Sequence, residues 1–318
     1  MSIPHPLPAS AQPAPPTAPT APASPGAAAG HHGLIDALPG VAANFAQIYF
    51  VPSASAGLLL FAVLALADFP AAITGLAASV AASCFASALR LPHTLRRNGL
   101  LGYNATLTGI AFGALWKPDT TYIAWLAVCV CLTVISTAAL AQRSRPALTG
   151  PFIGAMALTW AMQPWLHWLP RTGALACDMG TPGFVFCSVG QVVFVAPLVL
   201  GLLTWYILAL WNPRATLWAL AADIAVWSAL GALTTLWPTT LAQAGGVGIN
   251  AFLAALGLGM FGRRPAARFA GALLAGVICI ALGAVLGPLG WPYFTLPFNL
   301  AVWIVLGTTA QRGQPIAA

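Results

Sequence analysis

The sequence predicts an all-α membrane protein with ten transmembrane helices, arranged as two inverted repeats of five helices with Pro-broken or re-entrant pore segments. Three observations lead to this fold class: the apolar composition, the placement of charges between apolar runs, and the recurrence of motifs at a nearly fixed distance. The chain has 318 residues, of which 59% are hydrophobic and 5% charged, with a mean hydropathy of +0.86. Soluble domains carry about 25% charged residues. No soluble fold of this size has so apolar a surface.

Residues 1–33 differ from the rest of the chain because they consist mainly of Pro, Ala, Ser, Thr and Gly. Such a segment offers too little large apolar surface to offset the entropy of ordering, so we expect a disordered cytoplasmic tail. It lacks the basic and apolar regions of a signal peptide. We expect a first transmembrane repeat over 34–170, a connector over 171–183, a second repeat over 184–311 and a C-terminal tail over 312–318.

Ten apolar runs are long enough to cross a membrane, which takes about 20 mainly apolar residues. Several contain Gly or Pro, which neighbouring helices tolerate inside a bundle. The first five runs and the last five runs form the two repeats. The expected spans are 44–67, 71–90, 99–116, 120–142, 147–169, 184–211, 215–236, 245–262, 266–288 and 293–311.

The basic residues test this count, because Arg and Lys stay on the cytoplasmic side of a membrane. With ten spans, only Lys117 and Arg171 lie on the side opposite the termini, and the other ten basic residues lie on the same side as the termini. We therefore expect an integral protein of the plasma (bacterial inner) membrane, embedded in the lipid bilayer with both termini cytoplasmic. The net charge of +7 reflects the orientation of the chain in the membrane. It does not indicate a nucleic-acid-binding surface, because the basic residues come in twos and threes between apolar runs.

Two motifs of the first half recur in the second half at a distance of 146 residues. The segment 98–105 (NGLLGYNA) recurs at 244–251 (AGGVGINA), and 145–152 (RPALTGPF) recurs at 291–298 (WPYFTLPF). Five spans per half is an odd number, so the second copy crosses the membrane in the opposite direction. Transporters built in this way place the solute site near the membrane midplane, where the two halves meet.

The repeated residues offer the chemistry that a small polar solute needs. The P-x-x-T-x-P-F element carries two prolines, which disfavour continuous helix and leave carbonyls free to face a pore. Its threonines offer hydroxyls, and a Q-x-x-F element that recurs at a distance of 144 offers amides and flat apolar faces. A pore of this kind suits urea, which is small, planar, uncharged and rich in N–H donors. The candidate pore residues are Thr149, Thr295, Gln47, Phe50, Gln191 and Phe194.

Residues that would support other functions are few. Ion and proton transport uses intramembrane ionisable residues, yet the chain has no Glu, and only Asp223 lies well inside an expected span. The apolar runs contain no nucleophile–base pair, metal-ligand cluster or phosphate-binding loop, so we expect no enzyme activity, no cofactor and no metal. Cys177 and Cys187 fall in the connector region, on the side where disulfides persist. We expect them to be bonded, and two free thiols are the alternative.

The segment 99–107 (GLLGYNATL), the doubled P-x-x-T-x-P-F and the segment 295–300 (TLPFNL) resemble the urea transporter family, whose signature is L-P-x-x-T-x-P-F. The resemblance runs from about residue 44 to 311. It implies a homotrimer in which each protomer has its own pore between inverted halves, with an oxygen ladder, phenylalanine slots and a constriction. Leu107 and Leu253, which follow the two Gly-x-Asn elements, are the candidates for the constriction.

The sequence departs from the family pattern at several positions. The leading Leu of the signature is Arg145 in one copy and Trp291 in the other, and Ile249 replaces an aromatic residue. The family's pore glutamates are absent, and Gln191 is the candidate substitute for one of them. These departures bear on selectivity more than on fold. We expect facilitated diffusion of urea through a passive channel. The alternatives are a channel for another small neutral solute, such as a short amide or ammonia, and an ion-coupled secondary transporter.

Overall fold

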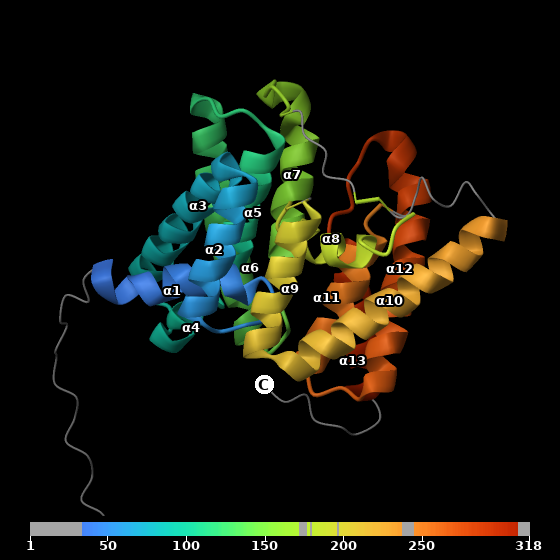
Figure 1. Ribbon diagram of the computed structural model, residues 1–318. Coiled ribbons are helices and arrows are strands. Elements are labelled where there is room, and N and C mark those ends of the chain that lie inside the picture. The colour runs from blue at the N-terminus through green and yellow to red at the C-terminus, as the bar shows by residue number, and fades with distance from the viewer. Residues whose placement is uncertain (1–33, 172–176, 179, 196, 237–244, 311–318) are drawn as a thin grey trace, which may run out of the picture.

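The computed structural model describes residues 34–171, 177–178, 180–195, 197–236 and 245–310. Within these residues the regular structure is helical, apart from one isolated bridge between Trp116 and Pro170, so the expected all-α class is confirmed (Figure 1). The helices are α1 (Leu34–Gln47), α2 (Ala54–Ala67), α3 (Phe69–Ala88), α4 (His93–Arg97), α5 (Tyr103–Leu115), α6 (Thr120–Gln142), α7 (Gly150–Leu166), α8 (Phe184–Gln191), α9 (Leu198–Trp211), α10 (Pro213–Leu236), α11 (Val247–Met260), α12 (Pro265–Leu286), the 3₁₀ helix η2 (Gly287–Leu289) and α13 (Leu296–Ala310).

Several helices begin where the sequence places a short polar side chain. Ser53, Asp68 and Asp119 are the N-caps of α2, α3 and α6, and each side chain accepts a hydrogen bond from the backbone N–H three residues later. These bonds satisfy donors that a helix leaves free in its first turn. At Asp119, the bond from the backbone N–H of Tyr122 is the main cause that lowers the pKa of the carboxyl.

The helices of the second half repeat those of the first. The first residues of α9, α10, α11, α12 and α13 lie 144 to 146 positions after those of α2, α3, α5, α6 and α7. The buried stripe of α3 also recurs on α10, shifted by 144 throughout. These buried positions are 71, 72, 75, 78, 79, 82 and 86 on α3 and 215, 216, 219, 222, 223, 226 and 230 on α10.

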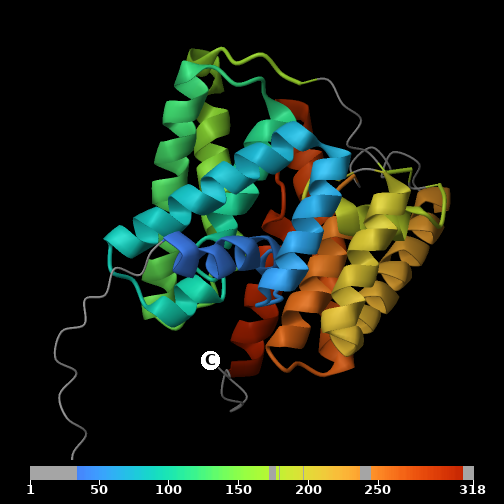
Figure 2. The ribbon, with the colours of Figure 1, turned by 60° about the vertical axis from the view of Figure 1, so that its left-hand side comes forward.

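The two halves of the chain lie side by side. In both views most helices of 34–166 lie to the left and most of those of 184–310 to the right (Figures 1 and 2). The halves meet where α2 packs on α9 and where α7 packs on α13, so each contact joins two counterpart helices. Two tryptophans add reciprocal hydrogen bonds: Trp303 Nε1 donates to Pro146 O at 3.1 Å, and Trp160 Nε1 donates to Gly290 O at 3.0 Å.

Two of the expected continuous spans are each divided into two helices. The run 44–67 is divided between α1 and α2, and the run 184–211 between α8 and α9. The breaks contain Phe50 with φ of 61° and Phe194 with φ of 63°. A right-handed helix cannot continue through left-handed backbone. Sequence periodicity does not reveal such a break, because the residues on both sides of it are equally apolar.

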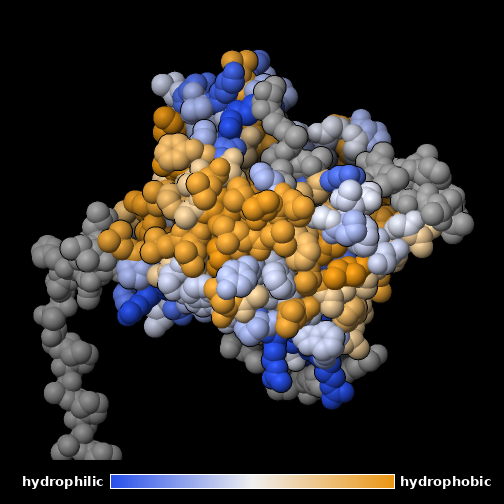
Figure 3. Space-filling view, viewed as in Figure 1, coloured by the Kyte–Doolittle hydropathy of each residue, from blue (hydrophilic) through white to orange (hydrophobic). Residues whose placement is uncertain are grey.

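The outer surface carries an apolar band. Figure 3 shows hydrophobic residues across the middle of the molecule, with hydrophilic residues above and below them. Among the exposed large hydrophobic side chains are Leu58 and Leu66 of α2 and Val199 of α9, which are 60%, 75% and 72% exposed. An apolar surface of this extent is typical of a site that contacts a membrane or another protein. Four described helices are long and apolar enough to span a membrane by themselves, namely α3, α6, α10 and α12.

Candidate functional site

Two cavities enter the helix bundle at opposite ends of α11. The first cavity, of about 460 Å³, includes Met260 and Phe261 at the C-terminal end of this helix. The second cavity, of about 260 Å³, includes Gly246 and Ile249 at its N-terminal end. Because a helix of 14 residues is about 21 Å long, the cavities open on different sides of the bundle.

Counterpart residues of the two halves line these cavities. Gln47 and Phe50 line the first cavity, and Gln191 and Phe194, 144 residues later, line the second. Thr295 also lines the second cavity. Five of the six candidate pore residues therefore border open space, and four of them do so as matched pairs.

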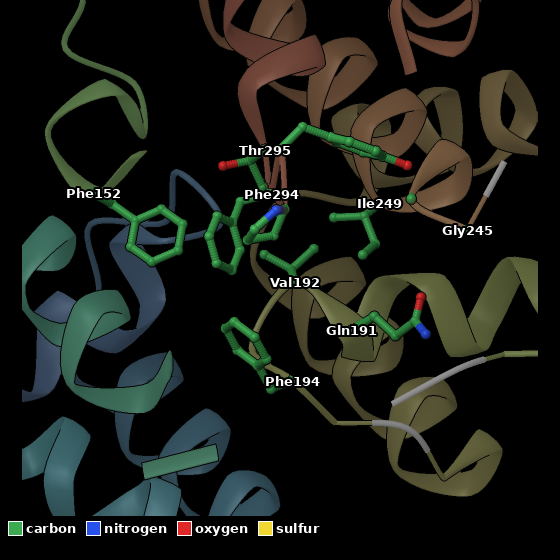
Figure 4. A pocket seen from close by; sticks show the side chains of 11 residues that line it. Phe152, Gln191, Val192, Phe194, Gly245, Ile249, Phe294 and Thr295 are labelled. Atoms are coloured by element: carbon green, nitrogen blue, oxygen red, sulfur yellow. The ribbon is translucent and has the colours of Figure 1, made fainter. Parts of the chain in front are cut away.

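Aromatic rings form one wall of the second cavity. In Figure 4 the rings of Phe152, Phe294 and Phe194 gather on one side, and Gln191 and Ile249 lie on the other. Phe152 and Phe294 pack edge to face, with ring centroids 5.5 Å apart. Phe152 belongs to the first half of the chain, so this wall is built across the junction of the two halves. Edge-to-face packing holds aromatic rings in fixed orientations.

The two signature threonines touch each other between the halves. Thr149 Oγ1 and Thr295 Oγ1 are 2.6 Å apart, and both residues are buried. Asn299 Nδ2 donates to Thr149 Oγ1 at 2.7 Å and to Thr295 O at 2.7 Å, which holds the pair in place. Thr149 is the N-cap of α7, and Thr295 immediately precedes α13. The positive ends of two helix dipoles therefore converge on the hydroxyl pair.

Buried asparagines fix the backbone next to each threonine. Asn104 Nδ2 donates to Leu148 O at 3.1 Å, and Asn250 Nδ2 donates to Phe294 O at 3.1 Å. The other side-chain atom, Oδ1, accepts the backbone N–H of Phe152 in the first half and of Phe298 in the second. The expectation that the proline motif leaves carbonyls free to face a pore is wrong for these two carbonyls. Each of these carbonyls instead accepts a hydrogen bond from an asparagine side chain, because backbone polar groups that are shielded from water need a partner within the protein.

The same bonds explain the unusual backbone of the motif. Leu148 has φ of 46° and its counterpart Phe294 has φ of 44°, both in the left-handed region. Such conformations persist only where the surrounding structure fixes them. The prolines then start α7 and α13 instead of interrupting a helix, because Pro151 and Pro297 fall in the first turn of each, where proline is tolerated.

Gln47 and Phe50 reach the first cavity from the turn that ends α1. The Gln47 side chain is 8% exposed, and its Oε1 has no hydrogen-bond partner among the described residues. The Phe50 ring packs edge to face on Phe298, with centroids 6.1 Å apart. It also lies against Gly257, where an added Cβ would come within 3.3 Å of the ring. Phe50 therefore borders the cavity and the second half of the chain together.

A comparison with models of known protein families identifies the family of this chain. Residues 38–310 match the family model described as urea transporter. The chain belongs to the urea transporter family. The match covers every residue that lines either cavity, and it supports transport of urea across a membrane by an integral membrane protein. This is a family of transport proteins and not of enzymes. A search of curated protein sequences found no match.

The two candidates for the constriction and the intramembrane aspartate do not line the cavities of this urea transporter. Leu107 and Leu253, the candidates for the constriction, lie within α5 and α11 and are fully buried. Asp223 on α10 is also fully buried, and neither carboxylate oxygen has a hydrogen-bond partner among the described residues. It occupies the position that Ser79 has on α3. Its place in the packed stripe separates it from both cavities.

Two further contacts fasten the segment between the halves. A disulfide joins Cys177 to Cys187 at the start of α8, with the Cα atoms 5.9 Å apart. Arg171 makes an ion pair with Asp68 at 2.9 Å and also donates to the carbonyl of Gly113. Arg171 and Asp68 side chains are 27% and 19% exposed, so solvent only partly screens the pair. The connector is thereby tied to α3, α5 and α8.

The structure adds site residues that sequence reasoning missed. Asn299 holds the threonine pair, and Asn104 and Asn250 fix the motif backbone. Phe152, which lines the second cavity, is the last residue of the P-x-x-T-x-P-F motif. The recurrence of Asn104 and Phe152 at a distance of 146 was the available signal for them. Asn299 has no such signal, because its counterpart is Ile153.

Proposed function

We propose that this urea transporter is a passive channel in which urea passes between the two cavities beside Thr149 and Thr295. The observation that carries the proposal is the hydroxyl pair, 2.6 Å apart and buried, at the junction of two halves that each contribute a cavity lined by Gln and Phe. A polar group buried without a hydrogen bond costs several kcal/mol. Acceptors spaced from one cavity to the other lower that cost for a neutral solute.

The polar groups along this route are suited to urea. Gln47, which carries a side-chain amide, lines the first cavity, and Thr295, which carries a hydroxyl, lines the second. Hydroxyls can donate to the urea carbonyl as well as accept from its N–H groups. The Phe50 and Phe194 rings offer flat faces to a planar solute at either end. The dipoles of α7 and α13 favour an approaching carbonyl oxygen and oppose a cation.

We further propose that the two halves are inverted repeats, with domain boundaries as the sequence predicts. Support comes from matched contacts: α2 with α9, α7 with α13, and the two Asn side chains on the motif backbone. In Figure 1, α7 lies in the upper part of the molecule and α13 in the lower part, although they are counterparts. The positive-inside pattern supports cytoplasmic termini and a bacterial inner membrane location. On this orientation, the first cavity opens to the cytoplasm.

The resemblance to the family supports a homotrimer in which each protomer conducts by itself. Leu107 and Leu253 remain our proposal for the constriction, because they occupy equivalent positions, 146 residues apart, in the counterpart helices α5 and α11. The helices α5 and α11 have 13 and 14 residues, shorter than a membrane span. This favours pore helices that enter the membrane without crossing it.

The deciding experiment is stopped-flow light scattering on proteoliposomes that carry an inward urea gradient. Urea permeability should exceed that of protein-free vesicles, whereas acetamide and glycerol should be conducted more slowly. The rate should not change when a pH gradient is imposed or collapsed. Faster conduction of acetamide or ammonia than of urea would assign the channel to another neutral solute. Accumulation of urea above the outside concentration would show an ion-coupled transporter.

A further inference from the structure

One feature of the first cavity has no role in the proposed route. Arg145, which stands where the family signature has Leu, lines the cavity and is exposed. It is the only residue with a formal charge among the described residues that line either cavity. Its counterpart Trp291 does not line the second cavity. The two cavities therefore differ in charge, although counterpart residues of the repeated motifs, such as Gln47 with Gln191 and Phe50 with Phe194, line both of them.

Local backbone bonds fix where Arg145 projects from the chain. Its N–H donates to Leu140 O at 3.0 Å, at the C-terminal end of α6, and Ser144 before it has φ of 51°. The adjoining residues Pro146, Ala147 and Leu148 line the same cavity. No hydrogen bond or ion pair joins the guanidinium to a described residue; the ion pair between described side chains is that of Arg171 with Asp68, which do not line this cavity. No described carboxylate lines the cavity to neutralise the charge.

The size of the cavity makes this charge effective throughout it. A sphere of about 460 Å³ is roughly 10 Å across, so most positions inside it lie within about 7 Å of a group on its wall. At that distance, effective dielectric constants between about 20 and about 80 give a repulsion that lowers the occupancy of a monovalent cation by about threefold to about sixtyfold. A neutral solute of the same shape feels no such repulsion. The charge can thus discriminate urea from cations of similar size.

We propose that Arg145 is a specificity-determining residue that keeps small cations, such as guanidinium and ammonium, out of the first cavity. The proposal rests on the proposed function, in which this cavity is one mouth of the urea route. Guanidinium is the sharpest case, because it is planar like urea and keeps its charge at every working pH. A Leu at this position would leave discrimination to the rest of the pore.

The test measures the potential of the cavity directly, in detergent-solubilised protein. Ala147→Cys places a reporter thiol on the cavity wall, and its modification rates are compared for cationic, anionic and neutral methanethiosulfonate reagents. The unsubstituted chain gives the background from the native cysteines. In the Arg145→Gln background, the cationic reagent should react threefold to sixtyfold faster and the anionic reagent correspondingly slower. The neutral reagent should react at the same rate.

Three controls separate the cavity charge from other effects. Arg145→Lys should retain the original reagent preference, and Arg143→Gln should retain most of it, because Arg143 is exposed but does not line the cavity. Ile249→Cys in the second cavity should not respond to Arg145→Gln. Raising the salt from about 0.01 M to about 1 M shortens the screening length from about 30 Å to about 3 Å. The reagent preference of the Arg145 protein should then fall.

An unchanged reagent preference in Arg145→Gln would overturn the proposal, as would an equal shift caused by Arg143→Gln. Asn98→Cys, on another part of the same cavity, serves as the reporter if Ala147→Cys does not fold. The salt measurement needs no substitution at Arg145. Like Arg145→Gln, high salt must raise the rate of the cationic reagent relative to that of the anionic reagent. Urea flux is measured separately in proteoliposomes. Absence of urea flux in the native protein would refute the proposed function, whereas the reagent preference would still report the cavity charge.

Discussion

Replacing Thr149 by Val should slow urea conduction while leaving the shape of the pore intact. In the structure the Thr149 hydroxyl lies 2.6 Å from the Thr295 hydroxyl and accepts a bond from Asn299 at 2.7 Å. Val removes the oxygen but keeps the branched shape. Asn299 Nδ2 retains its bond to Thr295 O, so the backbone near the site should hold its place. The loss falls on the passing solute, which has one hydroxyl fewer to replace its water contacts.

The size of the effect follows from the cost of an unmade hydrogen bond, about 1–3 kcal/mol in a buried site. This corresponds to a flux reduction of about fivefold to about 140-fold, at about 1.4 kcal/mol per factor of ten. Stopped-flow light scattering on proteoliposomes with matched protein content measures it. Thr149→Ser keeps a hydroxyl and should conduct within a few-fold of the native rate.

Thr133→Val is the matched control for loss of a buried threonine hydroxyl. Thr133 lies in α6, is 1% exposed, and bonds the carbonyl of Val130 in its own helix. Like Thr149 it lines neither cavity, but its hydroxyl bonds within α6 and not across the junction of the two halves. Urea flux should therefore be unchanged. Native flux in Thr149→Val would refute the reasoning. Equal slowing by Thr149→Ser would show that side-chain size, and not the hydroxyl, matters at this position.

Three further predictions concern stability and mechanism. Cys177→Ser should lower the free energy of unfolding by about 2–3 kcal/mol through loss of the short disulfide loop, measured as a lower denaturation temperature in detergent; an equal temperature in non-reduced native protein and mutant would contradict this. Asp223→Asn should leave urea flux unchanged and insensitive to a pH gradient, and loss of any uphill urea accumulation in this variant would instead reveal proton coupling. Asn250→Leu removes, among other bonds, those to the Phe294 carbonyl and from the Phe298 N–H, and it should destabilise the protein by about 2–4 kcal/mol. Asn104→Leu should give a loss of the same size if the two halves use the same support, and a neutral result in either would argue against that role.

The sequence by itself determined the membrane class, the helical content and the pairing of the two halves. These follow from properties that are local or additive: long apolar runs, few charges, and identical residue spacings. Gln47, Phe50 and their counterparts could be selected because duplication marks residues whose environments recur. The family resemblance came from the same repeated motif, and the family match over residues 38–310 bears it out.

Only the tertiary structure decided which groups meet. The contact between Thr149 and Thr295 spans 146 residues, and the Asn299 side chain that supports it has no counterpart in the first half. The helix breaks at Phe50 and Phe194 could not be predicted from the sequence either, because the backbone angle φ depends on the packing of the turn and not on hydrophobicity. Likewise, the position of Arg145 at a cavity wall arises from the way that α6 ends. Such features depend on long-range packing, which neither periodicity nor composition specifies.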